Sequence, residues 1–176
     1  MKQIKQIMLV VISAIILAIS SACGTVEATD DSQHVTKLAA KIADFDLPAG
    51  YTPEFTAEML GYTLAAYKGA SGPSHLFLIQ SEKESDGEEL GRMLTQLAPG
   101  SSDPNTRMTV VENRTATVRG QEVAVVISEG VNSENISYRQ ITVGFQGKGG
   151  PALLVLSETV ESWDQASVDT FLASIQ

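Results

Sequence analysis

Runs of β-branched and aliphatic residues separated by short turns dominate the second half of this chain, and they constrain its fold more than any other feature. Five such runs lie at residues 108–111, 115–118, 123–127, 137–145 and 152–156. Residues of these types favour strands, and turns as short as Arg119-Gly120-Gln121 join antiparallel neighbours. We therefore expect an antiparallel sheet. The apolar alternation breaks in the fourth run, which predicts a bulge near Arg139–Gln140.

Shorter strands are expected in the first half of the chain. Residues 62–67 and 75–80 flank the turn sequence GASGP (69–73), which indicates a hairpin. Phe45-Asp46-Leu47 alternates before a proline and a glycine, so one more short strand is expected there.

Apolar residues at helical spacing predict three helices. The first is a short helix that includes residues 35–42, with Asp31 or Ser32 as its cap. The second begins after Asp86, which opens a capping-box pattern. The third follows Ser162, whose S-x-x-Q spacing is that of another capping box, and it carries an apolar stripe to the end of the chain.

These elements together predict an α+β fold, with an antiparallel sheet of about six to seven strands and two amphipathic helices packed on it. We expect a signal peptide at residues 1–22, a lipid anchor and flexible linker at 23–33, and a single α+β domain at 34–176.

The N-terminus has the order of a secretory signal. A positive start is followed by an apolar run over residues 7–18, by small residues at 20–22, and by Cys23, the only cysteine of the chain. Ser21-Ala22-Cys23 matches the end of the bacterial lipobox, with Ser20 where leucine is usual. We expect cleavage before Cys23 and attachment of lipid, such as palmitate, to this residue. The protein would then be anchored at the extracytoplasmic face of the cell membrane.

Two other interpretations of the leader stay open. Ser20 and Ala22 also fit the small-x-small rule of ordinary signal peptidase, which would leave Cys23 as a free thiol. Alternatively, the leader is retained as an anchor. Its 16 apolar and small residues, 7–22, would span about 24 Å as a helix, against about 30 Å of hydrocarbon. All three interpretations place the domain outside the cytoplasm.

The charge of the chain restricts its partners. The formal net charge is −9, and removal of the two leader lysines takes it to about −11. The remaining basic residues are scattered rather than clustered. Because an acidic domain is repelled by phosphate backbones, we expect no nucleic-acid partner.

Residues 144–155, GFQGKGGPALLV, match a phosphate-binding loop only in part. Such a loop has the pattern G-x-x-x-x-G-K-[ST] and opens a helix. Here Gly149 follows Lys148, and a strand-like run comes next. Without a helix N-terminus, no ring of N–H groups is directed at a phosphate. We therefore expect a glycine-rich hairpin loop that ends at a strand-entry proline.

No catalytic, cofactor or metal site is predicted. The nucleophile-elbow pattern G-x-S-x-G fails at Pro73. The two histidines, His34 and His75, have no zinc-ligand spacing with each other or with Cys23. The acidic run over residues 82–89 lacks the D-x-[DN]-x-[DN]-G pattern of a calcium loop.

Core packing is the expected role of most aromatic residues in this chain. An alternative places Tyr51, Phe55 and Met59, which follow a Pro-Ala-Gly turn, on a loop that rims a pocket. A protein-binding function predicts an exposed apolar patch on the sheet or on residues 51–61.

Three short patterns resemble the PsbP-like superfamily, which includes extrinsic proteins of photosystem II and a Ran-binding protein. They are FDLPAGY (45–51), TVRGQEVAVV (117–126) and the closing DTFLASI (169–175). The resemblance spans roughly residues 43–176, with Tyr51 in place of the usual tryptophan. It implies an early strand with a Pro-Gly-aromatic turn, a glycine turn between two central strands, and a last helix over the sheet. The chain also resembles small lipoproteins of environmental bacteria.

The function expected from these features is that of a non-enzymatic, membrane-tethered module that binds a protein partner in the cell envelope. One alternative is a carrier of lipid or another small apolar ligand, with a pocket between helix and sheet. A second alternative is a hydrolase, which would need a base within hydrogen-bond reach of a nucleophile.

Overall fold

The computed structural model describes residues 27–70, 74–98 and 108–176, and this part of the chain forms an eight-stranded antiparallel sheet and three helices. The strands are β1 (Glu27–Thr29), β2 (Thr52–Met59), β3 (Tyr62–Lys68), β4 (His75–Ser81), β5 (Thr109–Val118), β6 (Gln121–Val131), β7 (Ser137–Gln146) and β8 (Pro151–Thr159). The helices are α2 (Ser32–Ile42), α3 (Gly87–Leu97) and α4 (Gln165–Ser174). The α+β class is confirmed, and the sheet is larger than expected.

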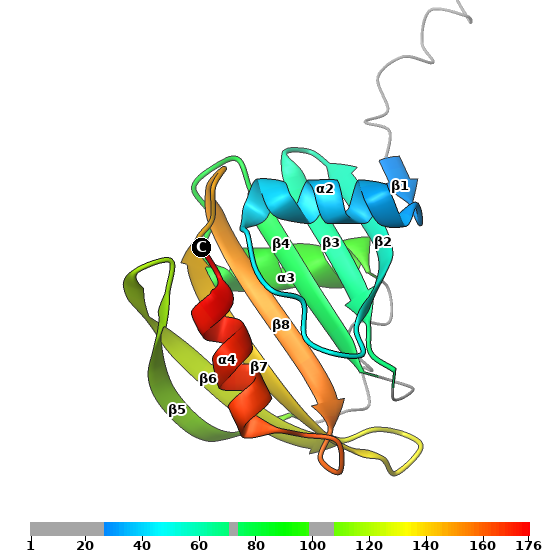
Figure 1. Ribbon diagram of the computed structural model, residues 1–176, viewed down its shortest axis with the longest axis vertical. Helices are drawn as coiled ribbons and strands as arrows, with labels where there is room; N and C mark the ends of the chain where they lie inside the picture. The colour runs from blue at the N-terminus through cyan, green and yellow to red at the C-terminus, as the bar shows by residue number, and fades with distance from the viewer. Residues whose placement is uncertain (1–26, 71–73, 99–107) are drawn as a thin grey trace, which may run out of the picture.

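The strands follow the order β1-β2-β3-β4-β8-β7-β6-β5 across the sheet. Helices α2 and α4 cover one face, and α3 covers part of the opposite face (Figure 1). None of the helices in the described residues is long and apolar enough to span a bilayer.

Strand β8 lies in the interior of the sheet and is buried on both faces. Leu154 and Leu156 pack beneath α2 and α4, whereas Leu153 and Val155 face α3. This double burial explains why its sequence is an unbroken apolar run. Each fully buried side chain of this kind contributes about 1.5–3 kcal/mol.

Aspartates cap all three helices. Asp31 accepts a hydrogen bond from the Gln33 N–H at 2.9 Å, and Asp86 accepts one from the Glu89 N–H at 2.8 Å, as expected. The capping box at Ser162 is wrong. The α4 helix begins later because Asp164, which accepts from the Ala166 N–H at 3.0 Å, is its cap.

Two strands lie where none was expected. The segment predicted as a loop forms β2, which pairs with β3 through the turn at Leu60-Gly61. A register shift between Pro53 and Phe55 hides its alternation in the sequence. Within the segment expected as flexible linker, β1 pairs with β2, and α2 begins at Ser32.

The strand expected at residues 45–47 and the bulge expected in β7 are both wrong. Residues 43–48 form a connection, fixed in part by hydrogen bonds between the backbones of Asp44 and Gln176. β7 pairs with β6 and β8 without a register shift. Its apolar residues do not all share one face because Ile141, Val143 and Phe145 lie on the α2/α4 face and Tyr138, an odd number of residues away, lies on the other. The bulge in this half of the sheet lies in β5, between Val110 and Glu112.

Candidate functional site

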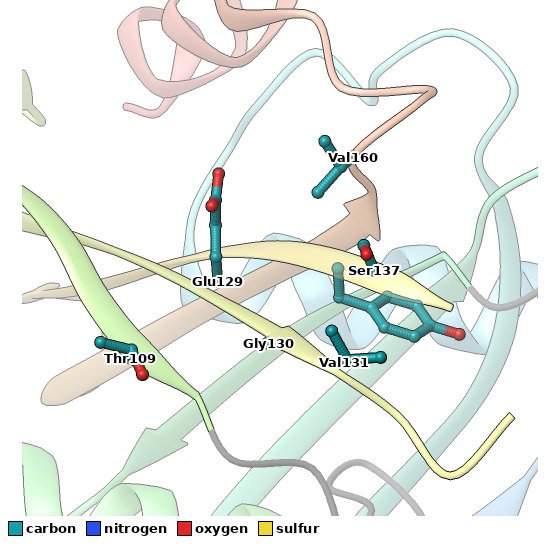
Figure 2. Close-up of a pocket in the computed structure, with 7 residues that line it drawn as sticks. Thr109, Glu129, Gly130, Val131, Ser137 and Val160 are labelled. Carbon is teal, nitrogen blue, oxygen red and sulfur yellow. The ribbon is translucent and has the colours of Figure 1, made fainter. Parts of the chain in front are cut away.

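An open hollow of about 590 Å³ lies where the β6–β7 hairpin meets the exit of β8 (Figure 2). It is lined by Thr109, Glu129, Gly130, Val131, Ser137, Tyr138 and Val160. Strand pairing brings these residues together, since Thr109 lies opposite Glu129 and Val131 opposite Ser137. The Val160 N–H donates to the Ser137 carbonyl at 2.9 Å, which fixes the end of β8 beside the hairpin.

Exposed hydrophobic side chains occur at this hollow and on the strand that leads into it. Of the six large hydrophobic residues that are exposed in the described part of the chain, two line the hollow, two adjoin its lining residue Thr109 in sequence, and one follows these along β5. We name the five the valine patch: Val131 and Val160, Met108 and Val110, and Val111. Their exposed fractions lie between 37% and 52%. The sixth, Leu60, lies in the β2–β3 turn. Such clusters mark interaction surfaces in soluble domains.

The sequence predicted an exposed apolar patch on the sheet or on residues 51–61, but it did not assign the patch to these residues. It assigned residues 108–111 to a strand without placing that strand at an edge. The mainly polar sequence from Glu112 to Thr117 was the signal available, because a strand buried in the middle of a sheet is apolar more continuously.

Arg139 of β7, which lies opposite the lining residue Glu129, contacts two side chains. Arg139 Nε donates to Glu129 Oε1 at 2.7 Å, and its guanidinium lies 5.4 Å from the ring centroid of Trp163. A planar guanidinium suits both contacts. The positive charge of Arg139 is therefore balanced by a neighbouring carboxylate.

Carboxylates flank the valine patch. Glu134 lies in the turn between β6 and β7, close in sequence to Val131, and Glu161 follows Val160. Both are exposed, and neither forms an ion pair with another described residue. Two exposed carboxylates without an ion pair to a described residue therefore lie close in sequence to the patch.

The three residues predicted to rim a pocket do not lie together. Tyr51 is buried on the α2/α4 face, where its hydroxyl donates to Glu158 Oε1 at 2.8 Å. Phe55 and Met59 lie on β2 and pack against the core on the α3 face. Met59 also lines a separate hollow of about 250 Å³. Core packing is therefore confirmed for these residues and the alternative of a shared loop is wrong, while their role in binding stays a prediction.

The Tyr51–Glu158 pair has shifted protonation. Burial, followed by the hydrogen bond to Glu158, raises the pKa of Tyr51 well above its usual range, so the hydroxyl stays a donor. Burial also raises the pKa of Glu158, against the opposing effect of the Tyr51 hydroxyl. This pair ties the start of β2 to the end of β8.

His75 lies beside a carboxylate and an aromatic ring. Glu54 Oε2 lies 3.6 Å from His75 Nε2, and the histidine ring stacks on Phe77. Ser157 is the cross-strand neighbour of His75. Ser71, of the GASGP turn, lies outside the described residues. Among the described residues, the geometry therefore places a histidine beside a carboxylate.

The glycine-rich segment is a hairpin loop, as predicted, and its polar groups contact other parts of the same domain. It joins β7 to β8, which begins at Pro151. The Lys148 N–H donates to the Ile42 carbonyl at 2.8 Å, and Lys148 Nζ lies 2.7 Å from Asp44 Oδ1. The Gly149 N–H donates to Gln80 Oε1 at 2.9 Å. The loop thus fastens the end of α2 to the sheet.

Two further expectations concern the anchor and metals. Cys23 and the leader, 1–22, lie outside the described residues, so their roles remain predictions. No group of three or more His, Cys, Asp or Glu side chains within residues 27–70, 74–98 and 108–176 is arranged to hold a metal ion.

No protein-family model matches this chain, and no curated protein sequence is detectably similar to it.

Proposed function

We propose that this protein is a lipid-tethered, extracytoplasmic module that binds a protein partner in the cell envelope through the valine patch and does no chemistry of its own. The observation that carries the proposal is that two exposed valines line one hollow and that three more exposed hydrophobic residues lie beside its lining residue Thr109 along the chain. Removing such a cluster from water lowers the free energy, and the surface of a bound partner can cover it.

The position of the patch relative to the tether supports this function. The leader and Cys23 run into β1, which forms one edge of the sheet, whereas β5 forms the other edge. Three of the patch residues, Met108, Val110 and Val111, lie at or next to the start of β5. A domain held at its β1 edge can therefore present this surface away from the membrane.

The finer fold assignment belongs to the same proposal. We propose a PsbP-like arrangement, supported by the Pro48–Tyr51 turn, by the tight turn at Gly120, and by the final helix α4 over the sheet. Because one fold serves many functions, this likeness adds nothing to the choice of partner.

A small-ligand carrier is the second candidate. A hollow of about 330 Å³ lies between residues 46–49 and α4, lined in part by Leu47, Pro48 and Phe171. It is open to solvent, whereas apolar carriers enclose most of their ligand. Titration with a fluorescent fatty acid separates the two functions, because binding that Phe171→Ala abolishes would favour the carrier.

The patch is tested by replacing Val131 and Val160 together with serine. The matched control is Leu60→Ser, which removes a more exposed aliphatic side chain from the β2–β3 turn, outside the valine patch. We expect the double variant to lose at least about tenfold in affinity for envelope proteins retained by the wild type, and the control to change little. Equal retention by all three proteins would refute the valine patch as the binding surface.

The tether is tested separately. Mass spectrometry of the mature N-terminus should show lipid on Cys23, and Cys23→Ala should move the protein from the membrane to the soluble fraction. A variant that stays in the membrane would show that the apolar leader is itself the anchor.

A further inference from the structure

We infer that the partner binds by adding an extended segment, with aliphatic side chains between lysines or arginines, to the outer edge of β5. This inference rests on the proposed function, because it names how the partner of the valine patch binds. The partner segment would form a further antiparallel or parallel strand next to β5, a known mode of peptide recognition.

The two edge strands of the sheet, β1 and β5, differ in length. One edge is closed by β1, which is only three residues long, a short strand of the kind that limits edge-to-edge association. The other edge is β5, which has ten residues, and no described strand pairs with its outer side. Residues 109–113 of β5 are all exposed.

The hairpin between β5 and β6 decides which backbone groups of β5 point outward. Arg119 and Gly120 have φ angles of 52° and 73°, which is the type I′ turn of a two-residue hairpin. In such a hairpin the flanking residues, Val118 and Gln121, form a hydrogen-bonded pair. Along the rest of the ladder, non-hydrogen-bonded pairs alternate with hydrogen-bonded pairs. Non-hydrogen-bonded positions follow at Thr117, Thr115 and Asn113. Their N–H and C=O groups face away from β6, and no strand of the described residues pairs with them.

The edge is continuous with the valine patch. Thr109, at the start of β5, lines the hollow, and Val110 and Val111 follow it. A segment that pairs with Asn113 to Thr117 and runs on past the bulge therefore reaches Val111, Val110 and Met108, the part of the patch that lies on and next to β5. This continuity makes the patch an apolar extension of the edge.

Charge selects the composition of the segment. Glu134 and Glu161 lie beside Val131 and Val160 without an ion pair to a described residue, and the chain as a whole carries −9. A basic and aliphatic segment complements both the carboxylates and the valines. A second copy of this chain does not, because two acidic domains repel each other and the bulge at Val110/Glu112 bends the edge.

The test uses the full-length chain in zwitterionic micelles and a synthetic heptapeptide, Lys-Val-Lys-Val-Lys-Val-Lys, as the probe. Saturating peptide should slow hydrogen exchange at the Asn113, Thr115 and Thr117 amides at least about tenfold. The matching Glu-Val peptide should leave them unchanged. Unchanged exchange with millimolar Lys-Val peptide would overturn the inference.

Thr115→Pro is the decisive variant, because it removes an outward donor and leaves the β5–β6 ladder intact. We expect about tenfold weaker peptide binding, whereas the matched Thr115→Ala, which keeps the N–H, should bind within about twofold of the wild type. N-methylation of the peptide's backbone along one edge should weaken binding as much, without any change to the protein. Strand addition would be overturned if Thr115→Pro bound the peptide as tightly as Thr115→Ala and the N-methylated peptide bound as tightly as the unmodified one.

The outcomes also separate this inference from the proposed function. If the serine substitutions at Val131 and Val160 weaken binding and Thr115→Pro does not, the patch binds its partner by side chains alone and the strand inference fails. If the protein without peptide sediments as a dimer that Thr115→Pro dissociates, the occupant is a second copy, and the inference is likewise overturned.

Discussion

Among the described glycines, Gly150 is the one where replacement by alanine should lower the free energy of unfolding most. A Cβ at Gly150 would lie 2.1 Å from the Ser81 carbonyl oxygen and 3.3 Å from the Ser81 carbonyl carbon. Both atoms belong to the backbone of β4, which is held in the middle of the sheet by β3 and β8. Neither atom can rotate away as a side chain could. The φ of 151° at Gly150 is also one that other residues rarely adopt.

The expected loss follows from these two effects. Forcing one extra carbon into a filled site costs about 1–3 kcal/mol, and an unfavourable backbone conformation adds about 1 kcal/mol. Gly150→Ala should therefore lose about 2–4 kcal/mol of unfolding free energy. With a urea slope of about 2 kcal/mol/M, the midpoint should fall by about 1–2 M.

The control lies in the same hairpin. Gly144 is on β7, and a Cβ there meets nothing within 4 Å. Gly144→Ala should leave the midpoint unchanged or raise it slightly, since alanine loses less backbone entropy on folding. If the two variants unfold at the same urea concentration, the close approach of the 147–150 loop to β4 is not what holds this hairpin, and the reasoning fails.

Three other predictions rest on the fold. Asp86→Ala removes the cap of α3 and should cost about 1 kcal/mol, measured as a lower thermal midpoint that Asp86→Asn largely restores. Leu154→Ala empties a fully buried position in the central β8 and should cost about 2–5 kcal/mol in urea unfolding, far more than Leu60→Ala. Glu158→Gln should be more stable than the wild type at pH 7. Burial raises the pKa of Glu158 above its ordinary value of 4.5, so the native state favours the neutral form and its stability falls as the pH rises through that pKa. The difference in thermal midpoint should vanish near about pH 4, and a constant difference at all pH values would contradict this cause.

The parts of the fold that sequence predicted are those with a strong local signal. Buried strands such as β4 and β8 are apolar runs, and α3 begins at an aspartate cap that the sequence displays. β2 was missed because Pro53 and a register shift interrupt its alternation, so it was predicted as a loop. β1 is too short to produce any pattern.

The candidate surface could not be predicted for a different reason. Whether a strand lies at an edge depends on strand order, which is a property of the whole chain. Here β8 returns to pair with β4, so the hairpin of β5 and β6 is left on the outside of the sheet. Val110 and Val111 have the same composition as buried strand residues. Only the topology makes them exposed.

The unpaired edge of β5 raises a physical question, because a long exposed strand invites aggregation. Two features of β5 oppose pairing with a second copy: the bulge between Val110 and Glu112, and the acidic charge of the chain. Both act against a like-charged domain that must approach as a rigid body. Neither acts against a flexible basic segment, which can follow the bend and gains from the same charge. The devices that keep this edge from associating with itself therefore also select the kind of partner that we propose for it.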